Sequence, residues 1–173
     1  ELLKSRDGLA LGICNGFQAL IKTGLVPFGE IRDVDASAPT LFHNRIARHI
    51  SRYAHTRVAS VKSPWLARME VGQVHTIPLS HGEGRFTAPA AVIADLVKNG
   101  QVAFQYCDAA GQPSNAIEFN PNGSLEAIEG ITSPCGRVLG KMGHSERTGA
   151  NVAKNIPGNK HQPLFQGGVD YFA

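Results

Sequence analysis

Along this chain, short runs of apolar residues are followed by stretches in which apolar and polar residues recur with helical spacing. Residues 8–14 form an apolar run without polar alternation, as in a buried strand of a parallel sheet. Residues 15–23 follow with helical spacing: Phe17 and Ile21 share one side, and Gly24 stands where a helix would end. A strand, a tight turn and a helix in succession predict an α/β protein.

The remaining chain continues this alternation. The short apolar or alternating pattern of strands recurs in residues 51–61, 73–79, 101–107, 127–132 and 136–142. A second helix is predicted at residues 89–98, with a proline in its first turn. Loops or turns are predicted where Gly, Pro and polar residues gather, in residues 26–39, 80–85, 108–113, 120–124 and 143–163. No repeat or linker divides residues 1–173, so we expect one domain.

Composition excludes several classes of protein. The 173 residues are 42% hydrophobic and 18% charged, which is typical of a globular domain with a real core. The net charge of +3 is small and scattered, so neither nucleic acid nor a membrane surface is an expected partner. No apolar run reaches the roughly 18 residues of a membrane span, and residues 1–7 lack the apolar stretch of a signal peptide. Three cysteines without a CxxC pair indicate a reducing compartment, so we expect a cytoplasmic protein.

The strongest signal of chemistry is Gly12-Ile13-Cys14-Asn15-Gly16, between the first predicted strand and helix. It is the thiol counterpart of the G-x-S-x-G nucleophile elbow, in which glycines relieve crowding around a strained residue. The helix N-terminus is expected to stabilise the thiolate and lower the pKa of Cys14, and the N–H of Asn15 is a natural oxyanion donor. The alternative is a buried structural cysteine in a glycine-rich turn.

A thiol nucleophile needs a base and a group that orients the base. His144 follows the predicted strand 136–142, and reactive groups of open α/β sheets gather beyond the carboxyl ends of strands. Glu146 faces the same way as His144 in an extended segment and can hold its imidazole. The predicted roles are Cys14 as nucleophile, His144 as base and then acid, and Glu146 as orienting residue. On spacing alone such a pair is more often solvated; the Cys14 motif favours catalysis.

The segment Ser80-His81-Gly82-Glu83-Gly84-Arg85 is a second candidate site. Its two glycines favour close approach of the backbone to a ligand or another chain, but a solvated tight turn explains them equally well. Cys107 and Cys135 lack glycine flanks and a nearby base. Cysteine and histidine spacings match no zinc pattern, so no metal site is expected.

Between residues 11 and 147 the sequence resembles class I, or triad, glutamine amidotransferases. Four motifs stand in the order seen in one branch of that family, the phosphoribosylformylglycinamidine synthases: Cys14-Asn15-Gly16-Phe17-Gln18, residues 80–85, Asn120-Pro121-Asn122-Gly123-Ser124 and His144-Ser145-Glu146-Arg147. The resemblance implies a flavodoxin-like fold, with an open, largely parallel twisted sheet flanked by helices. It also implies an enzyme of purine biosynthesis.

In terms of chemistry, the resemblance implies hydrolysis of L-glutamine through a glutamyl thioester on Cys14, with His144 and Glu146 completing the triad. The implied substrate contacts are Asn15, Gln18, Ser80 and His81. Ammonia would pass to a synthetase domain, in the same chain or in a separate subunit, that converts formylglycinamide ribonucleotide to formylglycinamidine ribonucleotide. ATP and Mg²⁺ would belong to that synthetase, and no cofactor is expected within residues 1–173.

Two departures accompany the resemblance. The family usually has a proline on each side of its histidine, where this chain has Gly143 and Ser145, so the loop is expected to be less rigid. The family's domain begins well upstream, with strands and a glycine-rich loop that carries a second oxyanion donor. We therefore expect the C-terminal part of such a domain. Two alternatives remain open: another thiol acyl-transfer hydrolase of related fold, and an inactive interaction fragment.

Overall fold

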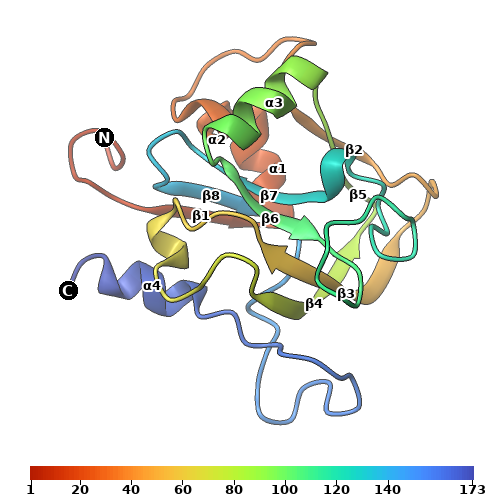
Figure 1. The fold of residues 1–173 in the computed structure, drawn as a ribbon. Coiled ribbons are helices and arrows are strands. Elements are labelled where there is room, and N and C mark those ends of the chain that lie inside the picture. The colour runs from red at the N-terminus through yellow and green to blue at the C-terminus, as the bar shows by residue number, and fades with distance from the viewer.

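The computed structural model describes residues 1–173 as an α/β fold around a six-stranded sheet (Figure 1). The strands lie in the order β1 (Ala10–Ile13), β8 (Val138–Lys141), β7 (Ile128–Thr132), β6 (Val102–Tyr106), β3 (Ile50–Val58) and β4 (Val74–His81). Only β1 and β8 run parallel, and every other neighbouring pair is antiparallel. The α/β class is thus confirmed, but the sheet of these residues is mixed rather than largely parallel. Strands joined by a short turn, such as β7 and β8, pair antiparallel, because parallel pairing requires a long crossover.

Helices cover both faces of this sheet. They are α1 (Asn15–Lys22), α2 (Leu25–Phe28), α3 (Ala90–Lys98) and α4 (Leu164–Asp170), with 3-10 turns η1 (Pro64–Leu66) and η2 (Leu125–Ala127). Figure 1 shows α1, α2 and α3 on one side of the sheet, and η1 and α4 on the other. No helix is long and apolar enough to cross a membrane.

Two apolar layers explain why the apolar runs do not alternate with polar residues. Phe17 and Ile21 of α1 pack in a cluster with Val138 of β8. The next residue of that strand, Leu139, belongs to the cluster on the opposite face with Phe104. Adjacent residues of a strand point to opposite faces, so a strand covered on both sides must be apolar at successive positions.

Residues 80–85, expected as a loop, are mostly strand. Strand β4 continues to His81, and after Gly82 a new strand β5 (Glu83–Thr87) pairs antiparallel with β2 (Thr40–His43). That partner lies about forty positions earlier in the chain, and such long-range pairing leaves no mark on the local pattern. The expected loop 26–39 likewise overlaps the short helix α2.

The asparagine-rich loop at residues 120–124 holds β5 in place. The side-chain amide of Asn122 donates to the carbonyl of Gly84 at 2.8 Å, and the N–H of Phe86 donates to Oγ of Ser124 at 3.0 Å. Both polar side chains are buried. The motif therefore supports a strand rather than a ligand.

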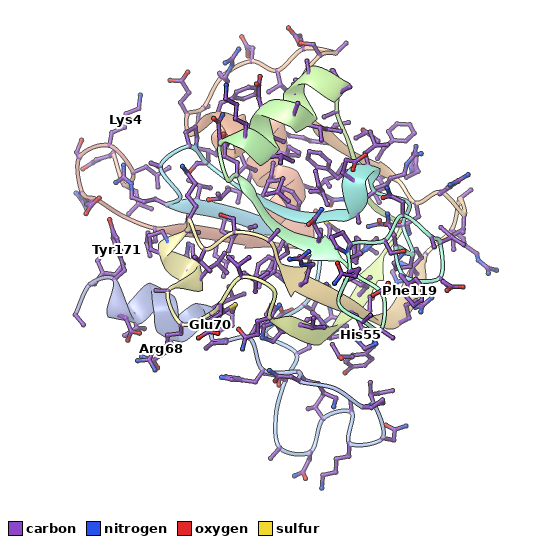
Figure 2. All side chains as sticks on the ribbon, in the orientation of Figure 1. Lys4, His55, Arg68, Glu70, Phe119 and Tyr171 are labelled. Atoms are coloured by element: carbon purple, nitrogen blue, oxygen red, sulfur yellow. The ribbon has the colours of Figure 1, made fainter.

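The C-terminal helix α4 is tied to two distant segments. Asp170 forms an ion pair with Arg68, a residue labelled beside α4 in Figure 2. The Tyr171 hydroxyl, also labelled there, donates to the Asp7 carboxylate at 2.9 Å. Residues 143–163, expected to be irregular, contain no helix or strand and lead from β8 to this helix.

Candidate active site

Cys14 occupies the strained turn that the sequence predicts. It lies between β1 and α1 with φ 54° and ψ −108°, a conformation that L-residues rarely adopt. A Cβ on Gly12 would lie 2.6 Å from the carbonyl of Gly16, so the turn closes only with glycine at position 12. A Cβ on Gly16 would meet nothing within 4 Å. The predicted crowding therefore applies to the first glycine and is wrong for the second.

The parallel pairing of β1 with β8 brings the nucleophile and the base to the same edge of the sheet. Ile13 pairs with Lys141, and the N–H of Cys14 donates to the Lys141 carbonyl at 2.8 Å. His144 follows three residues later, and its N–H donates to the carbonyl of Pro78 in β4 at 2.9 Å. Cys14 and His144 thus both lie just beyond the carboxyl ends of neighbouring parallel strands, as expected for reactive groups in α/β proteins.

Burial raises the pKa of the Cys14 thiol above its ordinary value. The backbone N–H of Asn15 and the guanidinium of Arg147 lower this pKa, and the Glu146 carboxylate raises it further. The predicted lowering by the helix N-terminus is therefore wrong in net direction, because desolvation of the thiolate outweighs the donors. A thiol in this state needs a base before it can attack.

A cavity of about 290 Å³ opens at the thiol. It is lined by Cys14, Gln18, Ser80, His81, Gly82 and Glu83. The thiol donates to the Ser80 carbonyl at 3.7 Å, and the side-chain amide of Gln18 donates to the Glu83 carbonyl at 3.0 Å. Three of the four predicted substrate contacts therefore line one cavity with the nucleophile. The fourth, Asn15, is not in the lining and acts on the sulfur through its backbone N–H. A larger hollow, of about 570 Å³ beside Arg48, contains no cysteine.

His81 is buried and fixed by a residue that sequence reasoning missed. Its Nδ1 lies 3.0 Å from Oδ1 of Asn44, whose side-chain amide donates to the His81 carbonyl at 2.8 Å. Burial, together with the nearby His49 and His144, lowers the pKa of His81 to about 4. No local sequence signal connects Asn44 to His81, because the two meet only after β2 and β5 pair.

The predicted pair of His144 and Glu146 is formed. Nδ1 of His144 lies 2.6 Å from Oε1 of Glu146. Nε2 of the same ring is buried without a hydrogen-bond partner, so no hydrogen bond joins it to the Cys14 sulfur. With the carboxylate accepting from Nδ1, Nε2 carries the lone pair and is the basic nitrogen. Arg147, beyond the predicted triad, lies 3.7 Å from Glu146 and is among the charges that lower the Cys14 pKa.

These groups are the parts needed for acyl transfer. A thiol that lines a cavity, an imidazole paired with a carboxylate, and a backbone N–H at a helix start lie at one edge of the sheet. Cys14, Cys107 and Cys135 are all free, and no three His, Cys, Asp or Glu side chains are grouped to hold a metal ion.

The chain is similar to a known family of domains and to named proteins. Residues 1–172 match the family described as the CobB/CobQ-like glutamine amidotransferase domain. The chain is 40% identical over 151 residues to phosphoribosylformylglycinamidine synthase subunit PurQ of Synechococcus elongatus, covering 87% of this chain and 58% of that protein. It is 37% identical over 163 residues to the same subunit of Gloeobacter violaceus, covering 93% of this chain and 62% of that protein.

A solved structure is also similar. The structure of PurLQS from Thermotoga maritima matches with a TM-score of 0.69 and 28% identity, over 98% of this chain and 65% of that chain. The present chain thus spans about three fifths of the length of the curated relatives it matches.

Proposed function

Because this chain belongs to the family of CobB/CobQ-like glutamine amidotransferase domains, we propose that it is the glutaminase part of a phosphoribosylformylglycinamidine synthase. One observation carries the proposal: Cys14 and the His144–Glu146 pair lie at the same edge of the sheet, beyond the parallel strands β1 and β8. The names of the similar proteins support the particular synthase.

In the first half of the reaction, Nε2 of His144 removes the proton from Cys14. The thiolate attacks the side-chain amide carbon of L-glutamine, and the N–H of Asn15 donates to the oxyanion that develops. The imidazolium then protonates the leaving nitrogen, the C–N bond breaks, and ammonia departs from a glutamyl thioester on Cys14.

Water completes the cycle. His144 now takes a proton from water, the resulting hydroxide attacks the thioester, and glutamate leaves as the Cys14 thiol reforms. Glu146 keeps the proton on Nδ1 and stabilises the imidazolium in both halves, because it accepts from that nitrogen at 2.6 Å.

Glutamine binds in the cavity beside the thiol. Gln18 and Ser80 are polar residues of its lining, and His81 is a neutral ring with a buried Nε2 that has no partner. Since burial holds the pKa of His81 near 4, the ring presents a hydrogen-bonding nitrogen without a charge.

The ammonia supplies a synthetase that consumes ATP, with Mg²⁺, and converts formylglycinamide ribonucleotide to formylglycinamidine ribonucleotide. The relatives are named as subunits, which favours a separate synthetase chain as partner. Such an enzyme works in the cytoplasm.

The test is glutamine hydrolysis by the complete amidotransferase. Cys14→Ala is expected to lower the rate of glutamate release by at least about 10³-fold, because no other group can form the thioester. Synthesis from free ammonia should persist, since that chemistry lies in the synthetase.

Cys107→Ala is the matched control, because Cys107 is also a free thiol but lies outside the cavity. This variant should hydrolyse glutamine at the full rate, and mass spectrometry should still detect the trapped glutamyl adduct on the protein. Peptide hydrolysis in place of glutaminase activity would contradict the proposal in favour of another thiol hydrolase.

A further inference from the structure

A buried ion pair lies behind the His144 loop. Lys141 of β8 and Glu129 of β7 are both fully buried, with Nζ 3.3 Å from Oε1. Burial lowers the pKa of the Lys141 ammonium, and the Glu129 carboxylate opposes that shift. Replacing a buried ion pair by apolar residues of similar size is often neutral or stabilising, so stability alone does not account for this pair.

The remaining hydrogen bonds of the pair go to the two residues that flank His144. Nζ of Lys141 donates to the Gly143 carbonyl at 2.7 Å and to Oγ of Ser145 at 3.0 Å. Oε1 of Glu129 accepts from the N–H of Gly143 at 2.5 Å. The pair therefore binds the loop backbone immediately before His144 and a side chain immediately after it.

Packing and the C-terminal segment tighten the same contact. A Cβ on Gly143 would lie 2.8 Å from Oε1 of Glu129 and 3.1 Å from Nζ of Lys141, so the pair packs directly against this glycine. On the other side, the Ser145 hydroxyl donates to Oε1 of Gln162 at 2.5 Å, and Gln162 is itself buried.

We propose that Lys141 and Glu129 are positioning residues, which hold residues 143–145 so that His144 stays between Glu146 and the Cys14 thiol. The inference rests on the proposed glutaminase function and names the part of the fold that sets its base. It also explains the two residues beside His144. Gly143 leaves room for the ion pair, and the hydroxyl of Ser145 accepts a hydrogen bond from Lys141. A displacement of about 1 Å at a reacting group can cost about 10²-fold in rate.

The decisive variant is Glu129→Leu/Lys141→Met, made in the complete amidotransferase. It removes both charges together, so no unpaired charge is left in the core, and it removes the side-chain hydrogen bonds of the pair to the loop. Lys141→Met alone leaves Glu129 buried and unpaired, and serves as the destabilised comparison.

Gln101→Leu is the matched control. Gln101 is buried, and its side-chain amide donates at 2.9 Å to the carbonyls of Pro27 and Thr132, so it too ties distant segments together. Neither of these hydrogen bonds involves the His144 loop.

In the double variant we expect kcat for glutamine hydrolysis to fall by about 10–10²-fold, while KM changes by less than about twofold. Its melting temperature should equal or exceed that of the wild type. Gln101→Leu should lower the melting temperature and keep kcat. A double variant with unchanged kcat would overturn the proposal.

Two further measurements keep the proposal testable. Should the double variant fail to fold, Ser145→Ala removes only the hydroxyl bridge between Lys141 and Gln162, and kcat should fall by about 2–10-fold; unchanged kcat would count against the tether. The imidazole resonances of His144 should be single and sharp in the wild type, and broadened or doubled in the double variant. If the wild type hydrolyses no glutamine, the proposed function fails, and these resonances still decide the positioning.

Discussion

Cys14 lies in a turn shaped by its immediate neighbours, whereas His144 lies in a loop held by residues far away in the sequence. The turn needs glycine at position 12 and a helix that starts at residue 15. The loop is held by hydrogen bonds to Pro78 of β4 and Glu129 of β7. A nucleophile can thus be recognised from five consecutive residues, while the position of its base depends on the assembled sheet.

The largest expected effect is a loss of kcat, and it differs between removal of the His144 imidazole and neutralisation of the Glu146 carboxylate. His144→Ala should lower kcat for glutamine by about 10²–10⁴-fold, because it removes the proposed base, and His81, the other imidazole near the thiol, has no carboxylate to orient it. Glu146→Gln should lower it by about 10–10²-fold, since an amide oxygen can still accept from Nδ1 but does not stabilise the imidazolium. Steady-state kinetics with circular dichroism as a folding control would decide. A larger loss in Glu146→Gln would reverse the assigned roles.

We expect His81 to make the stability of the protein depend on pH. It lines the Cys14 cavity, and His144 contributes to the lowering of its pKa. Burial holds the pKa of His81 at about 4, below its usual 6.5, so the unfolded state binds more protons between these values. The neutral His81 therefore makes its full contribution to the free energy of unfolding above about pH 6.5. That free energy falls as the pH falls toward 4, by roughly 2 kcal/mol at pH 5.

Urea unfolding of the wild type and of His81→Gln at pH 7 and pH 5 would measure this loss. His75, also buried with a pKa of about 4, contributes to the pH dependence of stability that remains in the variant. An identical slope in both proteins would show that His81 does not titrate as its burial requires.

The smallest effects concern three glycines. Gly12→Ala should cost about 1–3 kcal/mol, because its Cβ would strike the backbone of Gly16 at 2.6 Å. Gly143→Ala should cost a similar amount through Glu129 and Lys141. Gly16→Ala should change stability by less than about 1 kcal/mol, and in the stabilising direction, because its Cβ is unobstructed and alanine favours the helix. Thermal melts of the three variants suffice, and equal losses at positions 12 and 16 would refute the steric account.

Sequence reasoning was most successful where structure depends on near neighbours. The Cys14 turn, the helices α1 and α3, and the pairing of His144 with Glu146 all follow from residues within one or two turns of each other. The strand β5 and the bond from Asn44 to His81 were missed, because both arise from pairing between distant segments. The net direction of the Cys14 pKa was wrong because a helix N-terminus is visible in a sequence but desolvation is not.

The ion pair of Lys141 and Glu129 shows the same limit more sharply. In the sequence each is an ordinary charged residue in a strand, and such residues are mostly exposed. Only the antiparallel pairing of β7 with β8, beneath both covering layers, brings them together out of contact with water.

The hydrogen bond from Ser145 to Gln162 has a consequence for proteolysis of the chain between these two residues. Residues 146–151 are exposed, and a nick there would cut no strand of the sheet, but Leu164 of the apolar cluster around Phe104 lies in the downstream segment. The downstream segment would then stay in place only through its own contacts, among them the Asn159 carbonyl on the Thr76 N–H at 2.6 Å and the Gln162 side chain on Ser145. Nicked protein can therefore retain its fold and its thiol while losing the covalent link that keeps Gln162 near the base.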